Sequence, residues 1–175
     1  MDSRLCALSR LGDRHCENIL LDKQTGDCVH VDLNCLFWKG LTFQEPERVP
    51  FRLTPNLEDG LGITKAEGVF RRVCEISLRV LRSNRETLMS VLETLIYDPV
   101  VEWLPKKRND NVADAEEMAN REAIRTIGKV SDMLQGLQPG SVLPLSVEGQ
   151  VDKLIEQAHN HDNLALMYIG WAPWL

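Results

Sequence analysis

The sequence predicts an α+β fold that is mainly helical, with one short β-hairpin near its beginning. Two apolar runs, at residues 19–21 and 28–31, flank the turn-rich stretch DKQTGD. Two such runs joined by a loop that contains glycine are typical of a hairpin. Several longer stretches further along the chain repeat apolar residues with the period of an α-helix. Helices are therefore expected to account for most of the chain after the hairpin.

Two helices are expected after the hairpin, each announced by a capping box, in which Ser or Thr is followed three residues later by Glu. The first box is TKAE at residues 64–67, and the second is SNRE at residues 83–86. The residues expected to face inward on the first helix are Val69, Phe70, Val73, Ile76, Leu78, Val80 and Leu81. Those on the second are Leu88, Val91, Leu92, Leu95 and Ile96, and Asp98-Pro99 ends this helix.

Two more helices are expected in the second half of the chain. Residues 113–137 predict a long helix that Pro139-Gly140 breaks, with Met118, Ile124, Ile127, Val130 and Leu134 inward. Ser146 should cap a helix that carries Val147, Val151, Leu154, Ile155 and Ala158. The stretch HNHD at residues 159–162 interrupts this last helix. Its histidines and aspartate suggest a metal site, but no further ligand cluster is visible, and a polar turn is the better interpretation.

The composition indicates one ordinary globular domain in a reducing compartment. The chain has 175 residues, of which 43% are apolar, and a net charge of −6. That charge gives no general attraction to nucleic acid or to an anionic membrane. Five scattered cysteines show neither a disulfide framework nor zinc spacing, so they are interpreted as reduced thiols. No apolar run approaches the roughly 20 residues of a membrane span, and no signal peptide is visible.

Three polar side chains around the hairpin could together carry out phosphoryl transfer. Asp13 and Asn18 are five residues apart in a polar stretch, and Asp32 follows the second apolar run. The hairpin would bring Asn18, just before its first strand, close to Asp32, just after its second. Mg²⁺ prefers hard oxygen ligands and usually binds one or two carboxylates together with substrate phosphates. One ion could then contact Asn18 and Asp32, while Asp13 faces an incoming hydroxyl.

A structural role is the competing interpretation of these residues. A single Asp or Asn in a loop is most often a cap or a turn former. At any one of the three positions that interpretation would be preferred, but the whole set at these spacings favours phosphoryl transfer.

The motif GDRHxxN at residues 12–18, followed by VDLN at 31–34, resembles the catalytic and metal-binding loops of the phosphatidylinositol-3-kinase-related protein kinases. The stretches VDLNCLFWKG, VPFRLT, EGVFRR and LMSVLETLIYDP resemble the ATR-type checkpoint branch of that family. The end of the chain, LPLSVEGQVDKLIEQA through MYIGWAPWL, resembles its closing FATC segment. The resemblance extends over about residues 10–175 and is weakest near 105–135. It implies a kinase C-lobe followed by a helical FATC segment.

The resemblance also implies roles for individual residues. Asp13 resembles the catalytic base, and His15 the histidine beside the transferring phosphate, with a purely structural histidine as the alternative. Asn18 and Asp32 resemble the ligands that bind Mg²⁺, with Mn²⁺ as a second ion, and through it ATP.

Two positions depart from the family pattern. The usual D-F-G appears as Asp32-Leu33-Asn34, in which Asn is itself ATR-like and Leu33 is expected to supply the apolar anchor. Cys16 stands where these kinases usually have Gly, which would restrict the loop backbone because only Gly takes positive φ freely.

Residues 33–54 correspond to the activation segment, which apolar residues 35–38 should anchor at its start and VPFRLT at its end. Its charges are mixed, since Lys39, Arg48 and Arg52 accompany Glu45 and Glu47. A lipid kinase would need a basic cluster here to hold headgroup phosphates, so a protein hydroxyl is the better substrate. The resemblance implies Ser or Thr followed by Gln.

The sequence thus divides into a partial kinase domain (residues 1–104), a linker with a regulatory helix (105–142) and FATC (143–175). Only twelve residues precede Asp13, and they hold no glycine-rich phosphate loop and no ATP-binding lysine. The chain is therefore expected to be the C-terminal part of a larger nuclear serine/threonine kinase of DNA-damage signalling, and inactive alone. The implied partners are the kinase N-lobe, upstream helical repeats, protein substrates and an ATR-interacting regulatory subunit. A lipid-kinase fragment and a non-catalytic helical interaction module are the alternatives.

Overall fold

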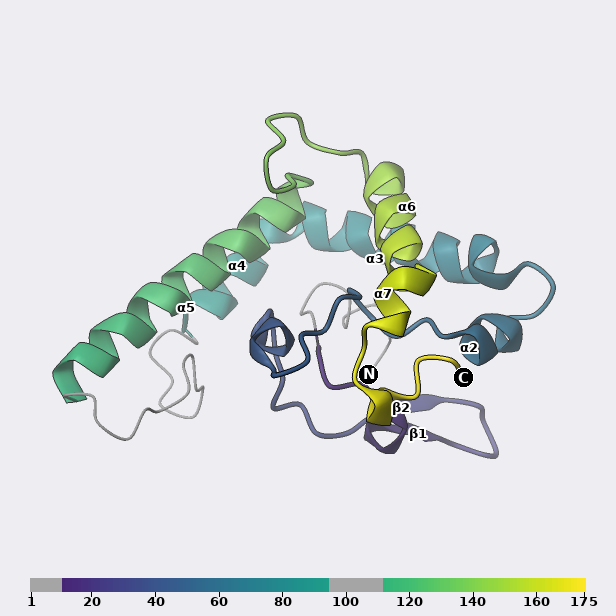
Figure 1. The fold of residues 1–175 in the computed structure, drawn as a ribbon. Helices are drawn as coiled ribbons and strands as arrows, with labels where there is room; N and C mark the ends of the chain where they lie inside the picture. The colour runs from purple at the N-terminus through teal and green to yellow at the C-terminus, as the bar shows by residue number, and fades with distance from the viewer. Residues whose placement is uncertain (1–10, 95–111) are drawn as a thin grey trace. The chain divides into compact units, whose positions relative to one another are not determined.

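The computed structural model describes residues 11–94 and 112–175, which form two compact units (Figure 1). One unit combines the chain up to Leu78 with Leu145–Leu175, and the other holds Arg79–Pro144. The described residues are mainly helical and contain one two-stranded antiparallel sheet, so the expected fold class is confirmed.

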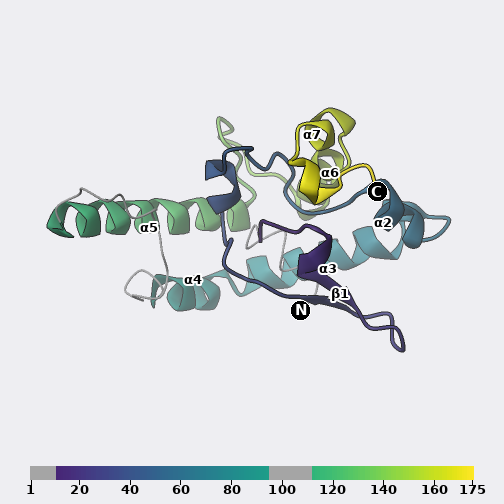
Figure 2. The same cartoon turned by 60° about the horizontal axis from the view of Figure 1, so that its bottom comes forward.

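The hairpin forms as the sequence predicts, and it lies in the first unit. Strands β1 (Ile19–Leu21) and β2 (Cys28–His30) pair antiparallel, with Ile19 opposite His30. A 3₁₀ turn, η1 (Cys16–Asn18), leads into β1. The hairpin projects away from the helices at the end of the chain in both ribbon views (Figures 1 and 2). The second strand ends one residue earlier than expected, at His30.

The segment of residues 33–54 is irregular except for one 3₁₀ turn, η2 (Lys39–Thr42). Cys35 and Phe37 are buried near its start and Phe51 near its end. Both predicted anchors are therefore confirmed. The elements that follow are α2 (Pro55–Gly60), η3 (Lys65–Glu67) and α3 (Val69–Ser83).

The first predicted capping box is wrong. Thr64 makes no capping hydrogen bond with its side chain, and η3 separates it from the start of α3. Glu67 instead pairs with Arg71, one turn along, at 2.6 Å between Oε1 and Nη2. This ion pair uses the carboxylate that a capping box would need.

The second predicted capping box is also wrong, because the chain does not leave the helical conformation there. The backbone N–H of Asn84 donates to the carbonyl of Val80, and the Ser83 hydroxyl donates to the carbonyl of Arg79. The next helix, α4 (Arg85–Thr94), follows directly.

The core of the first unit forms between residues 51–53, the η3–α3 region and α6 (Val147–Ala158). Ser146 caps α6 as predicted, because its side chain accepts the backbone N–H of Gly149 at 3.0 Å. The buried cluster comprises Phe51, Leu53, Ala66, Leu78, Val151, Ile155 and Ala158. This core joins the end of the 33–54 segment to a helix almost one hundred residues later in the chain.

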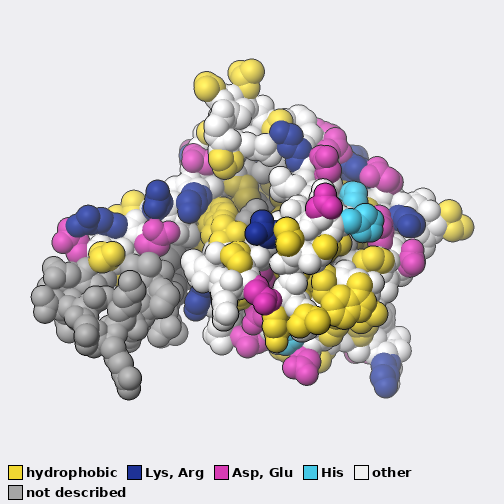
Figure 3. Space-filling model, in the orientation of Figure 1, with side chains coloured by type: hydrophobic (Ala, Val, Ile, Leu, Met, Phe, Trp, Pro, Cys, Tyr) yellow, Lys and Arg dark blue, Asp and Glu magenta, His cyan; other side chains and the backbone are white. Residues whose placement is uncertain are grey.

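The C-terminal tail packs on the 33–54 segment. It contains α7 (His161–Ala165), capped by the Asn160 side chain, and a 3₁₀ turn, η5 (Ile169–Trp171). Leu164, Met167 and Trp171 form a buried cluster with Val49. The expected polar turn at 159–162 is confirmed up to Asn160, after which α7 begins, and the described residues hold no group of three or more potential metal ligands. Leu166, Tyr168, Ile169, Trp174 and Leu175 remain exposed, and hydrophobic side chains gather over this segment in Figure 3.

The second unit contains α4 and α5 (Val112–Gln135), which lie against each other. Ile127, Val130 and Leu134 are buried as expected. The helix ends at Gln135, just before Gly136, whose φ of 82° is left-handed, and so it stops before the Pro139-Gly140 pair that was predicted to break it.

Several residues that were expected to face inward are exposed to solvent, so those predictions are wrong. The exposed ones are Val69, Ile76 and Val80 on α3, Val91 on α4, and Met118 and Ile124 on α5. On α3 the inner stripe is Phe70, Cys74 and Leu78, which are spaced by four residues; Phe70 and Leu78 were predicted to face inward, and Cys74 was not. The periodicity thus predicted the helix and part of its buried face, but it also assigned to that face residues that are exposed. Leu95, Ile96 and Asp98-Pro99 lie outside the described residues, in which no helix is long and apolar enough to cross a membrane.

We expect Ile155→Ala to destabilise the protein by about 2–5 kcal/mol, because Ile155 is 2% exposed and its loss leaves a cavity. The matched control is Ile63→Ala, since Ile63 is fully exposed and its loss should change stability by about 0.5 kcal/mol or less. Urea unfolding of both variants measures the difference. Equal losses in the two variants would contradict the described core.

Candidate functional site

Asp13, Asn18 and Asp32 are brought together as the hairpin prediction required. The Asn18 side chain donates through Nδ2 to the carbonyl of Asp13 at 2.8 Å, and the backbone N–H of Val31 donates to the carbonyl of Asn18 at 3.1 Å. Asn18 therefore lies between the loop that carries Asp13 and the strand end that precedes Asp32. Because its amide nitrogen is used in this contact, the amide oxygen is the atom with which Asn18 could hold a cation.

The buried guanidinium of Arg14 holds these segments together, a role that was not predicted from the sequence. Arg14 is 2% exposed and donates to the carbonyls of Gly12 at 2.8 Å and Val31 at 2.7 Å. It also donates to the carbonyls of Asn18, at 3.3 Å, and Asp32. The only signal was its place inside the DRH motif, because no periodicity marks a buried arginine in a loop.

Both aspartates adopt a left-handed backbone, with φ of 58° at Asp13 and 52° at Asp32. Residues other than glycine rarely adopt this region, although Asp is among those that tolerate it. Asp32 is exposed, and its Oδ1 accepts the backbone N–H of Asn34 at 3.3 Å. The carboxylate thus lies at the surface, on the residue that follows the backbone hydrogen bond between Val31 and buried Asn18. Leu33, expected to be an apolar anchor, is 42% exposed, so that expectation is not met in this chain.

His15 lies beside Asp13, with Nε2 3.9 Å from Oδ1. Its Nδ1 accepts the backbone N–H of Glu17 at 3.3 Å and so caps η1. A neutral His15 must therefore carry its proton on Nε2, on the side of Asp13. The structural interpretation of His15 is confirmed by this cap, and its role beside the transferring phosphate stays a prediction.

Cys16 does not restrict the loop as expected, because it lies in η1 and is not among the described residues with positive φ. Its exposed thiol receives a hydrogen bond from Nη2 of Arg52 at 3.6 Å. The departure from Gly at this position is therefore compatible with the observed backbone.

Arg52 joins residues 12–18, the candidate catalytic loop, to the tail. Its guanidinium donates to the carbonyls of Arg14 and Trp171 and lies 4.5 Å from the centre of the Trp171 ring. It also donates to the carbonyl of Ala172 at 3.2 Å. Burial lowers the pKa of Arg52, and the Cys16 thiol partly offsets this. Arginine nevertheless stays charged in proteins, so a cation faces the tail.

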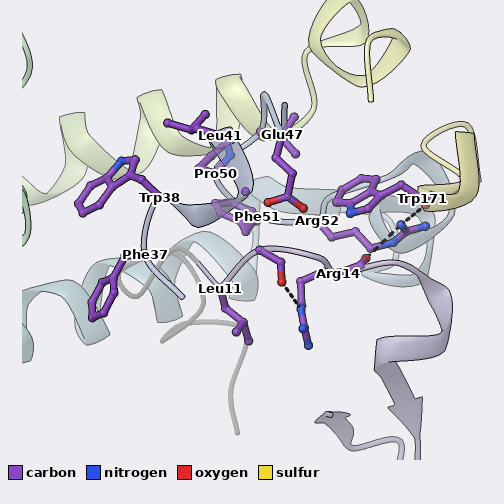
Figure 4. A pocket seen from close by; sticks show the side chains of 13 residues that line it. Leu11, Arg14, Phe37, Trp38, Leu41, Glu47, Pro50, Phe51, Arg52 and Trp171 are labelled. Carbon is purple, nitrogen blue, oxygen red and sulfur yellow. Dashed lines mark hydrogen bonds between the residues drawn. The ribbon is translucent and has the colours of Figure 1, made fainter. Parts of the chain in front are cut away.

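Behind the loop lies a small cavity of about 20 Å³, shown in Figure 4. Residues of the catalytic loop, of the 33–54 segment and of the tail line it together, among them Arg14, Glu47 and Trp171. Glu47 Oε1 accepts the backbone N–H of Asp13 at 2.6 Å. From the sequence, Glu47 was expected only to contribute to a mixed surface charge, because a contact across 34 residues leaves no local pattern.

Comparison with known proteins gives two domain matches. Residues 8–104 match the family model for phosphatidylinositol 3- and 4-kinases, and residues 144–175 match that for the FATC domain. The first match extends over more than half of the chain.

Several named proteins are similar over almost the whole chain. It is 56% identical over 164 residues to the serine/threonine-protein kinase ATR of Arabidopsis thaliana, across 94% of this chain and 6% of that protein. It is 52% identical over 164 residues to protein kinase rad3 of Schizosaccharomyces pombe, across 94% of this chain and 7% of that protein. A solved structure of the FAT and kinase domain of CtTel1 matches 99% of this chain and 11% of its own, with a TM-score of 0.80 and 41% identity. The chain thus spans a small part of the length of these curated relatives.

The thiols of Cys16 and Cys35 offer a test of the burial of the 33–54 segment near its start. Burial raises the pKa of the Cys35 thiol to about 11, and the carboxylates of Glu47 and Asp13 add to this. At pH 8 roughly one Cys35 thiol in a thousand is ionised, and only the thiolate reacts. We expect iodoacetamide to alkylate exposed Cys16 in the folded protein and Cys35 only after unfolding, as measured by peptide mass spectrometry. Labelling of Cys35 at the rate of Cys16 before unfolding would contradict this placement.

Proposed function

Because the chain belongs to the phosphatidylinositol 3- and 4-kinase family, we propose that it is the C-terminal part of an ATR-type serine/threonine protein kinase. The parent protein transfers the γ-phosphate of ATP to Ser or Thr followed by Gln. The observation that carries the proposal is the placement of Asp13, Asn18 and Asp32 around one buried arginine. Their spacing in the GDRHxxN and VDLN motifs agrees with that placement.

Asp13 acts as the catalytic base. Its backbone is held from two sides, by Asn18 at its carbonyl and by Glu47 at its N–H, and its carboxylate is partly exposed. Such a group orients the attacking hydroxyl and accepts its proton, and general-base assistance of this kind contributes about 10²–10⁴-fold.

Asn18 and Asp32 hold the metal ion. An amide oxygen and an exposed carboxylate are hard donors that fit Mg²⁺, and Mn²⁺ accepts the same donor set. Two side chains suffice because nucleotide phosphates complete such sites, which agrees with the lack of larger ligand clusters in residues 11–94 and 112–175. When bound, the ion neutralises charge on the phosphates of ATP.

His15 lies next to the base and stabilises the negative charge of the phosphoryl group that is transferred. With Nδ1 engaged by the Glu17 N–H, the imidazole presents its Nε2 side near Asp13. A proton held on Nε2 is a donor toward a phosphoryl oxygen.

The contacts and the exposure of the basic residues in the 33–54 segment favour a protein substrate over a lipid. Arg52 is engaged by the tail, so the exposed cations of the 33–54 segment are Lys39 and Arg48. Exposed Glu45 lies in the same segment. Such a mixed surface would hold the phosphates of an inositol headgroup poorly, because like charges repel.

We assign residues 1–104 to the kinase C-lobe, 105–142 to a linker with a regulatory helix, and 143–175 to FATC. The protein acts in the nucleus in DNA-damage and replication checkpoint signalling, together with the kinase N-lobe, upstream helical repeats and an ATR-interacting regulatory subunit. The matched families and the names of the relatives support these assignments.

The experiment uses the full-length protein that carries this sequence, with a Ser-Gln peptide, an Ala-Gln peptide and phosphatidylinositol vesicles as substrates. We expect ATP-dependent phosphorylation of the Ser-Gln peptide alone. Asp32→Ala should reduce it to background by removing a metal ligand, and Asp13→Asn should lower it about 10²–10⁴-fold by removing the base.

The 175-residue polypeptide serves as a further arm of this experiment. We expect it neither to phosphorylate the peptide nor to bind Mg-ATP tightly in calorimetry, because its residues before Asp13 supply no phosphate loop or ATP-binding lysine. Near-normal activity of full-length Asp32→Ala would contradict the metal assignment. Transfer to lipid instead of peptide would contradict the substrate assignment.

A further inference from the structure

Glu47 connects the 33–54 segment to the backbone of the candidate base. Its Oε1 accepts the N–H of Asp13 at 2.6 Å, a short hydrogen bond to a charged acceptor. Asp13 has the left-handed φ of 58°, which a residue with a side chain keeps only when its surroundings hold it. The Glu47 carboxylate is one of the groups that hold the Asp13 backbone in this conformation.

Two glycines make room for this carboxylate. A Cβ added at Gly12 would lie 2.4 Å from Glu47 Oε2, and one added at Gly40 would lie 2.0 Å from it. Neither distance is tolerable for non-bonded atoms. The backbone N–H of Glu47 also donates to the carbonyl of Gly40 at 3.0 Å. The carboxylate is therefore seated between the catalytic loop and η2, in space that the two glycines leave open.

The tail reaches the same place through Trp171. This residue is 4% exposed, and its buried Nε1 has no hydrogen-bond partner among the described residues. Trp171 and Glu47 line one cavity of about 20 Å³, and Figure 4 shows the carboxylate turned toward the indole. A cavity of roughly this size accommodates one water. Such a water can accept the indole N–H and donate to the carboxylate.

We propose that Glu47 is a positioning residue of the phosphoryl-transfer site. It holds Asp13 through the backbone N–H and, through one water, connects Asp13 to Trp171 of the tail. The inference rests on the proposed kinase function and adds a path by which the C-terminal tail supports the base. The path runs through hydrogen bonds, in addition to the direct contacts of Arg52.

The test compares three variants of Glu47 in the full-length kinase with a control on the same segment. Glu47→Ala removes the acceptor, and Glu47→Asp keeps the charge but shortens the side chain by one methylene. Glu47→Gln keeps both the length and an oxygen acceptor. The control is Glu45→Ala, because Glu45 is exposed.

We expect kcat to fall about 10²-fold in Glu47→Ala and Glu47→Asp, with the KM for ATP within about twofold of wild type. Glu47→Gln should restore kcat to within about tenfold of wild type, and the control should behave as wild type. Hydrogen exchange of the peptide that contains Asp13 should accelerate in the Ala and Asp variants, while exchange of α6 peptides stays unchanged.

Wild-type kcat in Glu47→Asp, or a Gln variant as slow as the Asp variant, would overturn the hydrogen-bond role. If Glu47→Ala unfolds the protein, faster hydrogen exchange of α6 will reveal it. The comparison of kcat between Glu47→Asp and Glu47→Gln then decides whether the hydrogen bond to Asp13 matters. A full-length wild-type protein that phosphorylates neither peptide nor lipid would overturn the proposed function. In that case the exchange of the Asp13 peptide still decides whether Glu47 holds this backbone.

Discussion

The site depends on the burial of one arginine side chain in a loop. Arg14 itself lies outside any helix or strand, yet its guanidinium donates to four backbone carbonyls that come from both sides of the hairpin. A charge is costly to bury unless hydrogen bonds compensate it, and the guanidinium offers five donors in a fixed fork. The fork fixes the ends of the hairpin relative to the loop, which places Asn18 beside Asp32. The short strands β1 and β2 would not define this geometry alone, since an isolated hairpin is marginally stable.

A second set of contacts joins this assembly to the end of the chain. Arg52 contacts Arg14 on one side and the carbonyls and ring of the tail on the other. Glu47 holds Asp13 from the same segment. The closing residues of the chain thus lie one side chain away from the catalytic loop, although about 155 positions separate them in the sequence. Burial of Trp171 fixes this arrangement, because large apolar side chains contribute about 1.5–3 kcal/mol when fully buried.

The sequence predicted the features that have local signals. The hairpin followed from two apolar runs around DKQTGD, and the cap of α6 followed from Ser146 before a helical pattern. The capping boxes failed because Glu67 found a stronger partner in Arg71 and because the helical backbone continues through Ser83. Arg14 and Glu47 were missed because their contacts reach distant carbonyl and amide groups, which leave no periodicity. Likewise, the direction in which α3 buries its face depends on α6 and residue 51, not on α3 itself.

The buried guanidinium of Arg14 holds the site together through its hydrogen bonds. The unfolding free energy of Arg14→Lys, compared with that of Arg48→Lys, tests this claim most directly. Lysine keeps the charge at position 14 but cannot span four carbonyls with one ammonium group. We predict a loss of about 2 kcal/mol or more for Arg14→Lys, with faster exchange of the Val31 amide that bonds Asn18. Exposed Arg48→Lys should stay within about 0.5 kcal/mol of wild type. Equal stability of the two variants, with the Val31 amide still protected, would contradict the account.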